Sequence, residues 1–128
     1  MQLKLCCVSK SEKWVDEQGE PLNLQTHSLT DIWNSSAMRE VRRKMLAGEK
    51  VPACERCYHE ESLGQNSHRG WVNQHWLGND EDSQVYVTKV QRSMTREYRV
   101  DDLPVYDDSD RAISATWPAG CAMRTSAA

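Results

Sequence analysis

The sequence contains no phenylalanine and no long hydrophobic run in its 128 residues. Hydrophobic residues make up 38% and charged residues 27%, which indicates a polar chain with a small core. No apolar stretch approaches the ~20 residues of a membrane span, and the first ten residues lack the apolar stretch of a secretory signal. We therefore expect a cytoplasmic protein with no membrane contact, large enough for one small domain.

A strong charge of one sign is also missing, since the formal net charge is -3. Proteins that bind nucleic acid through its phosphates usually carry a marked positive charge. The charge therefore predicts no nucleic-acid partner. It equally gives no reason to expect attraction to an anionic membrane surface.

The cysteines lack the even count that a secreted disulfide framework usually shows. There are five of them, and they are clustered: Cys6 and Cys7 are adjacent, Cys54 and Cys57 form a C-x-x-C pair, and Cys121 stands alone. In a reducing compartment a C-x-x-C pair is more often a metal or redox site than a disulfide. The pattern therefore predicts thiol chemistry in the first half of the chain.

Hydrophobic spacing and capping residues predict a mostly helical domain. Ser28, with Asp31 three residues later, resembles a capping box, and Gly48 and Gly64 are suited to end helices. The predicted elements are a strand over 3–8, a loop over 9–27, a helix from Ser28, a helix from Ser35 or Ser36 to about Ala47, a helix over 54–63, a helix around 71–76 and a strand over 85–90.

Helical spacing also predicts which side chains are buried. Trp33, Met38, Val41 and Met45 fall on apolar faces and are expected to form core. The basic run over 42–44 is most simply a solvated helix face.

The C-x-x-C pair has a clear chemical rationale. Thiolates suit soft metal centres, namely zinc or iron in sulfide clusters. At the start of a helix, Cys54 and Cys57 project to one side, and the exposed N–H groups of the first turn favour their negative charge. Zinc sites and redox motifs share this spacing, so the pair alone leaves the chemistry open.

The segments around the C-x-x-C pair help to choose among zinc, iron–sulfur and redox chemistry. Cys6-Cys7-Val8-Ser9 is followed by residues 28–35 (SLTDIWNS), residues 38–49 (MREVRRKMLAGE) and residues 52–58 (PACERCY). In order and spacing this series resembles the twitch subdomain of radical SAM proteins, the shortened form of the SPASM auxiliary-cluster domain. The resemblance covers roughly residues 3–70.

The resemblance implies that Cys6, Cys54 and Cys57 bind an auxiliary 4Fe-4S cluster. Cys7 matches the second cysteine of the family's doublet, which is not usually a ligand. The family's first cysteine lies on a preceding strand, and Met1 falls where a family glycine would stand. We therefore expect this chain to begin inside the motif, without that first ligand.

The resemblance also implies a parent enzyme. Such enzymes cleave S-adenosylmethionine reductively to a 5′-deoxyadenosyl radical, and the partners implied here are the radical SAM core and a peptide or small-molecule substrate. This chain lacks the C-x3-C-x2-C motif of that core, so we expect no independent catalysis and no catalytic residues.

The tail suggests what became of that motif. Translated one base out of register, the codons from Arg111 to Ala122 are able to encode Gly-Asn-Leu-Cys-Asn-Leu-Ala-Cys-Arg-Met-Cys. We therefore hypothesise a frameshift near 107–110, which would make Cys121 no ligand and residues 108–128 a disordered tail. The nucleotide sequence tests this directly.

Together these inferences predict a small, mostly α-helical, cysteine-rich domain centred on a metal, with a short N-terminal strand or hairpin remnant. Its expected parts are a cluster region over 1–78, a linker toward a missing core over 79–107 and the tail.

Two other functions stay open. A structural zinc module would use Cys6, Cys54 and Cys57 with either Cys7 or His59. A thiol–disulfide oxidoreductase would use Cys54 and Cys57 alone, although the βαβ pattern expected for it is absent.

Overall fold

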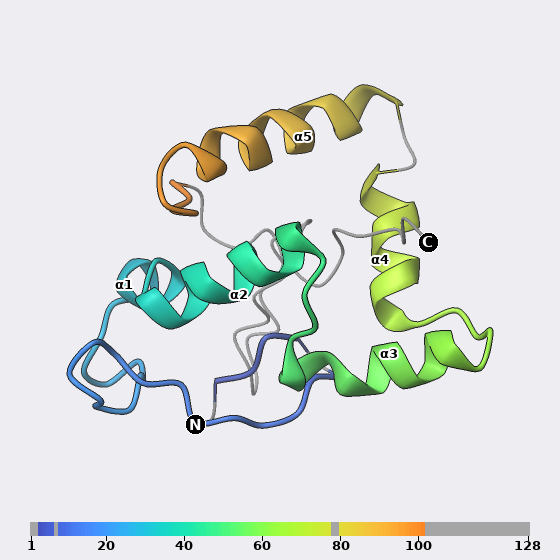
Figure 1. Ribbon diagram of the computed structural model, residues 1–128. Helices are drawn as coiled ribbons and strands as arrows, with labels where there is room; N and C mark the ends of the chain where they lie inside the picture. Colours follow the sequence, from blue (N-terminus) through green and yellow to red (C-terminus); the bar gives the residue numbers. More distant parts are fainter. Residues whose placement is uncertain (1–2, 7, 78–79, 102–128) are drawn as a thin grey trace.

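The computed structural model describes residues 3–6, 8–77 and 80–101, and this part of the chain is helical (Figure 1). Its elements are α1 (Leu29–Trp33), α2 (Ser36–Ala47), a short 3-10 helix η1 (Pro52–Cys54), α3 (Glu55–Ser62), α4 (His68–Leu77) and α5 (Asp80–Met94). The mostly helical prediction is therefore confirmed. Within the described ranges no helix is both long and apolar enough to cross a membrane.

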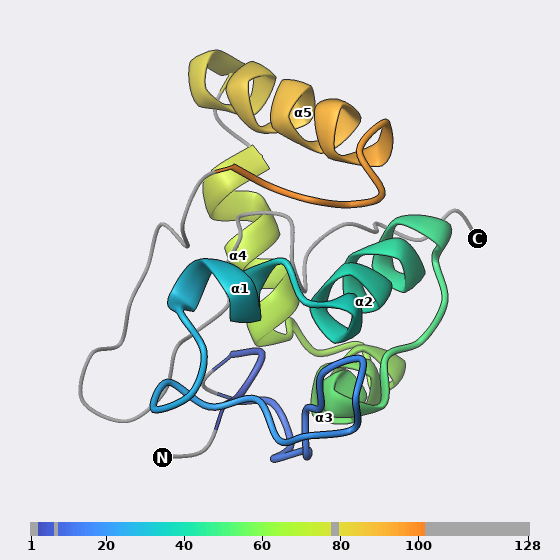
Figure 2. The ribbon, with the colours of Figure 1, turned by 90° about the vertical axis from the view of Figure 1, so that its left-hand side faces the viewer.

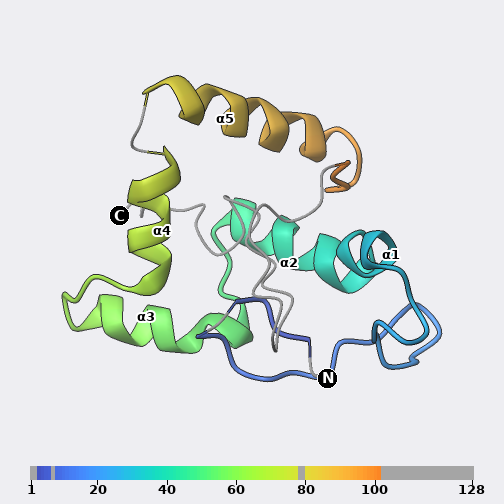
Figure 3. The ribbon, with the colours of Figure 1, turned by 180° about the vertical axis from the view of Figure 1, so that it is seen from behind.

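The helices are arranged around α2. In Figures 1 and 3, α3 and α5 lie on opposite sides of α2, and α4 runs from the end of α3 toward α5. α4 contacts α5, and α1 contacts α2. The N-terminal segment passes beside the beginning of α3, which Figure 2 shows from a second direction. The first residues of the chain therefore lie next to the C-x-x-C pair.

The predicted helix ends are confirmed by their capping contacts. The Ser28 hydroxyl accepts from the Asp31 backbone N–H at 3.1 Å and donates to the Asp31 carboxylate at 2.6 Å. Ser35 caps α2 by accepting from the Met38 N–H. Gly48 ends α2 in the left-handed conformation, with φ of 76°, which glycine adopts without a Cβ penalty.

The strand predicted over residues 3–8 does not form in the described part of this segment. Instead the chain turns back on itself at Cys6. The Ser9 hydroxyl donates to the Cys6 carbonyl at 2.9 Å and accepts from the Cys6 N–H at 3.2 Å. These side-chain bonds compete with a strand ladder. The hairpin remnant is likewise not seen in the described residues, where an isolated antiparallel bridge joins Val15 to Pro21.

The strand predicted over 85–90 is wrong, because this stretch lies inside α5. Its valines favour strands, but tertiary packing outweighs that preference. Val90 and Ser93, one helical turn apart, are buried, and the Thr88 hydroxyl donates to the Gln84 carbonyl as helical threonines do. Val90 packs against Trp33, together with Val100.

The predicted core residues are buried as expected. Met38, Val41 and Met45 form one cluster with Leu5 and Cys54, and Trp33 is the centre of a second cluster with Val90 and Val100. The first cluster includes Cys54, so one of the predicted ligands is also part of the hydrophobic core.

The interpretation of residues 42–44 as a solvated face is wrong at Arg42. Its side chain is only 4% exposed. The guanidinium lies over the Trp33 ring at 4.5 Å and donates to the carbonyls of Trp33 and Tyr98. Arg43 is more exposed than Arg42, as a solvated face predicts, and it pairs with Glu40 and Glu49. The predicted tail over 108–128, with Cys121, lies outside the described residues.

Candidate metal centre

Cys6 is held in a buried turn next to α3. Its side chain is 2% exposed, and the Ser9 hydroxyl bonds described above fix its backbone. The Lys10 N–H donates to the Ala53 carbonyl at 3.0 Å, and the Lys10 ammonium pairs with Glu55. These two contacts attach the N-terminal segment to the residues that flank Cys54.

Cys54 and Cys57 lie at the beginning of α3. Cys54 is the last residue of η1, and its N–H donates to the Val51 carbonyl at 2.9 Å. Cys57 follows three residues later, so its side chain points to the same face of the helix. Each of the two is 2% exposed, and neither they nor Cys6 form a disulfide. The three predicted ligands are thus all buried thiols.

Burial and neighbouring groups shift the pKa of the Cys57 thiol. Burial raises the pKa of the Cys57 thiol, while a hydrogen bond from the backbone N–H of Arg69 lowers it. Charge repulsion from Cys6 and Cys54 raises it further. That the three thiols bind one centre stays a prediction of the resemblance.

The sequence did not predict that residues at the start of α4 would pack against α3, the helix that follows Cys54. Besides its N–H, Arg69 brings a guanidinium that forms a two-pronged ion pair with Glu61, at 2.8 and 2.5 Å. Ser67, directly before α4, is 1% exposed and accepts from the Gly70 N–H at 3.0 Å. A serine ahead of a helical run is a capping signal, so Ser67 was the available clue to this turn.

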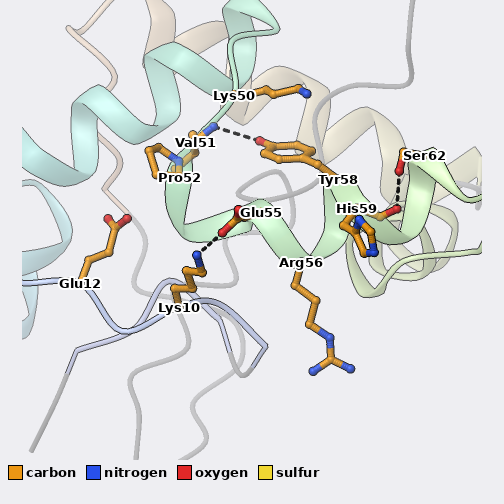
Figure 4. A pocket seen from close by; sticks show the side chains of 10 residues that line it. All are labelled: Lys10, Glu12, Lys50, Val51, Pro52, Glu55, Arg56, Tyr58, His59 and Ser62. Carbon is orange, nitrogen blue, oxygen red and sulfur yellow. Dashed lines mark hydrogen bonds and ion pairs between the residues drawn. The ribbon is translucent and has the colours of Figure 1, made fainter.

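His59, the alternative zinc ligand, lies on another side of α3. It is exposed and lines an open groove of about 810 Å³ with Lys10, Glu55 and Ser62 (Figure 4). Two residues along a helix correspond to a rotation of about 200°, which separates His59 from the buried Cys57. The structure does not bring these two side chains together. Cys7 lies outside the described residues.

The donor set fits a thiolate-bound metal centre, because it consists of soft sulfur ligands screened from water. In the described part of the chain, no group of three or more His, Cys, Asp or Glu side chains is arranged to hold one metal ion. Tetrahedral zinc would need thiolates roughly 3.8 Å apart, given Zn–S bonds of about 2.3 Å. An iron–sulfur cluster does not require that arrangement, since each thiolate binds a different iron.

A comparison with protein families agrees with this geometry. Residues 2–58 match the model of the SPASM family, described as an iron-sulfur cluster-binding domain. The matched segment ends one residue after Cys57, so it contains all three buried thiols. No curated protein and no solved structure matches the chain significantly.

The family match indicates the general chemistry of the site. SPASM domains bind iron–sulfur clusters, and the buried cysteines are the residue type that holds such clusters. α4 and α5 lie outside the matched segment.

Proposed function

We propose that Cys6, Cys54 and Cys57 bind a 4Fe-4S cluster, as the auxiliary-cluster part of a radical SAM protein. The observation that carries the proposal is the burial of three free thiols, in two segments 48 residues apart, inside the segment that matches the SPASM family. A 4Fe-4S cluster usually takes four cysteines, so the fourth iron is left for another ligand. Cys7 is the nearest candidate in the sequence.

The proposed context is a parent enzyme that contains a radical SAM core. Reductive cleavage of S-adenosylmethionine would belong to that core, since the sequence contains no C-x3-C-x2-C motif. The SPASM domain would contribute a cluster site beside the core, for electron relay or for binding a peptide or small-molecule substrate. We also propose a cytoplasmic location, because reducing conditions keep cysteines available as ligands.

Anaerobic reconstitution with iron and sulfide tests the proposal. We expect a brown protein with broad visible absorption, and iron and sulfide in the proportions of one cubane per chain. Replacing Cys54 or Cys57 with Ala should abolish most of the absorption, because a cluster held by two thiolates is exposed to loss. Cys121→Ser is the matched control and should leave it unchanged.

The outcomes separate the candidates. A colourless protein with stoichiometric zinc would contradict cluster binding and favour the zinc module. A cluster that survives Cys6→Ala and Cys57→Ala would contradict the assignment of the ligands. Loss of absorption in Cys7→Ser would identify Cys7 as the fourth ligand.

A further inference from the structure

Residues 10–14 form an extended segment on the surface of the molecule. No helix or turn interrupts these residues, and the next one, Val15, makes the antiparallel bridge to Pro21. The side chains at positions 11, 13 and 15 are exposed, whereas those at positions 12, 14 and 16 are half-buried. Alternation with a period of two is the pattern of a β-strand that covers a core with one face. The segment therefore has the form of a strand.

One edge of this segment is open. In an extended chain, successive residues present their backbone N–H and C=O groups to opposite edges. The Lys10 N–H donates to the Ala53 carbonyl, so the edge that contains the groups of Lys10 faces η1. The backbone groups of Ser11 and Lys13 belong to the other edge, and they form no hydrogen bond within the described residues. An open strand edge is a template for pairing with an incoming extended chain.

The same segment borders the groove over α3. Lys10 and Glu12 contribute side chains to the groove and Ser11 between them does not (Figure 4), as the alternation requires. The rest of the lining comes from residues between 50 and 62, in η1 and along α3. A strand that pairs with the open edge would direct alternate side chains to the same side as Lys10 and Glu12. Those side chains would enter the groove.

The charge of the groove indicates which side chains it accepts. Three permanent cations and two carboxylates line it, although the formal net charge of the whole chain is -3. Lys50 forms no ion pair within the described residues, and its ammonium lies 5.7 Å from the centre of the Tyr58 ring. Arg56 pairs with Glu60 at side-chain exposures of 65% and 26%, and pairs exposed to water are weak. Carboxylates therefore complement the α3 side of the groove, and Glu12 opposes them on the other side (Figure 4).

We propose that an acidic peptide segment binds here in extended conformation. It adds as a strand to the edge formed by residues 11 and 13, and it places its acidic side chains in the groove toward Lys50 and Arg56. In this mode of recognition, main-chain hydrogen bonds supply affinity and alternate side chains supply specificity. The inference does not rest on the proposed cluster binding, because none of the three buried thiols lines the groove.

Fluorescence anisotropy with a short labelled peptide of alternating glutamate and threonine tests the inference on the full chain. We expect saturable binding that weakens as salt is added, and no binding of the matching peptide of lysine and threonine. Methylating the backbone nitrogens that face the open edge keeps the charge but removes the N–H donors, so it should abolish binding. Lys50→Gln should weaken binding about threefold. Glu12→Gln should strengthen it, because a repelling carboxylate is lost.

Arg96→Gln is the matched control, since it removes the same charge as Lys50→Gln at a position outside the groove. Arg96 pairs with Asp101 beyond the end of α5, on the far side of α2 from α3 (Figures 1 and 3), so its removal should leave the affinity unchanged. Equal weakening by Arg96→Gln and Lys50→Gln would show unspecific attraction and overturn the inference. Equal binding of the methylated peptide, or no binding of the glutamate peptide, would overturn it as well. Metal analysis of the same samples reports separately on the proposed cluster.

Discussion

Two arginines in this molecule lie over aromatic rings, and their surroundings are opposite. Arg42, on α2, lies over Trp33 and donates to two backbone carbonyls. Arg69, on α4, lies over Tyr58 and grips the Glu61 carboxylate. The first contact joins α1, α2 and the segment after α5. The second joins α4 to α3 beside Cys57.

The difference lies in how each positive charge is compensated. Burial, with repulsion from Arg39, lowers the pKa of Arg42 to about 10. Hydrogen bonding to Glu61 raises the pKa of Arg69 above its ordinary value. Arg42 is therefore held by neutral acceptors, whereas Arg69 is held by an opposite charge. The same stacking contact serves a purely structural role in one region and creates a charge-sensitive pair in the other.

The largest expected effect comes from removing the Arg42 clamp. Arg42→Ala leaves the carbonyls of Trp33 and Tyr98 without this donor and removes the cation from the Trp33 ring. Hydrogen bonds from charged donors contribute about 1.5–3 kcal/mol each, and relief of the buried charge offsets part of the loss. We expect the free energy of unfolding to fall by about 2 kcal/mol, measured by urea denaturation.

Arg43→Ala is the matched control one residue along α2. Its partners Glu40 and Glu49 are half exposed, and exposed ion pairs stabilise little. The change should be small. Equal losses in Arg42→Ala and Arg43→Ala would show that burial of Arg42 does not distinguish the two positions.

The next effect concerns acid stability in the Arg69 region. Hydrogen bonding to Arg69 holds the pKa of Glu61 below its usual value. A carboxyl with a lowered folded-state pKa stabilises the fold above its unfolded pKa, and this contribution is lost as the pH falls through the folded-state pKa. Glu61→Gln should therefore cost about 1 kcal/mol at neutral pH and flatten the fall in stability on acidification.

The comparison predicts that Arg42→Ala leaves this acid dependence unchanged. Within the described ranges Arg42 pairs with carbonyls and no carboxylate, so no lowered carboxyl pKa is tied to it. Denaturation curves at a series of acidic pH values would check both variants. A Glu61→Gln protein with the wild-type acid slope would contradict the stabilising role of the pair.

The features that sequence reasoning predicted well depend on local chemistry. Ser28 was predicted as a cap, and Ser35 as one of two candidates, because a serine oxygen bonds to an N–H only two or three residues away. Gly48 was recognised as a helix end because its conformation favours glycine.

The features it missed depend on partners that are distant in sequence. Arg42 has a charged side chain on a helix, and its burial depends on Trp33 and on the carbonyl of Tyr98, which is 56 residues away in the sequence. The valines of α5 have a strand preference, and the packing of Val90 against Trp33, which is distant in sequence, outweighs it. The ion pair between Arg69 and Glu61 joins two helices, so neither residue type alone signals it.

The smallest predicted effect separates the two roles of Tyr58. The Arg69 guanidinium stacks on its ring. Its hydroxyl accepts a hydrogen bond from the Val51 N–H at 3.1 Å (Figure 4). Tyr58→Phe keeps the ring and removes only the hydroxyl. Because Tyr58 is half-buried and water has access to replace the bond, we expect a loss of about 0.5 kcal/mol in urea denaturation.

Tyr58→Leu is the informative partner variant, since it removes the ring as well. It should cost more than Tyr58→Phe, because the Arg69 guanidinium then loses its stacking surface and the core loses part of its wall beside Cys54. If the two variants are equally destabilised, the ring contributes nothing to the Arg69 contact. The resemblance between the two arginine–aromatic contacts would then be geometric only, with Glu61 alone holding Arg69 in place.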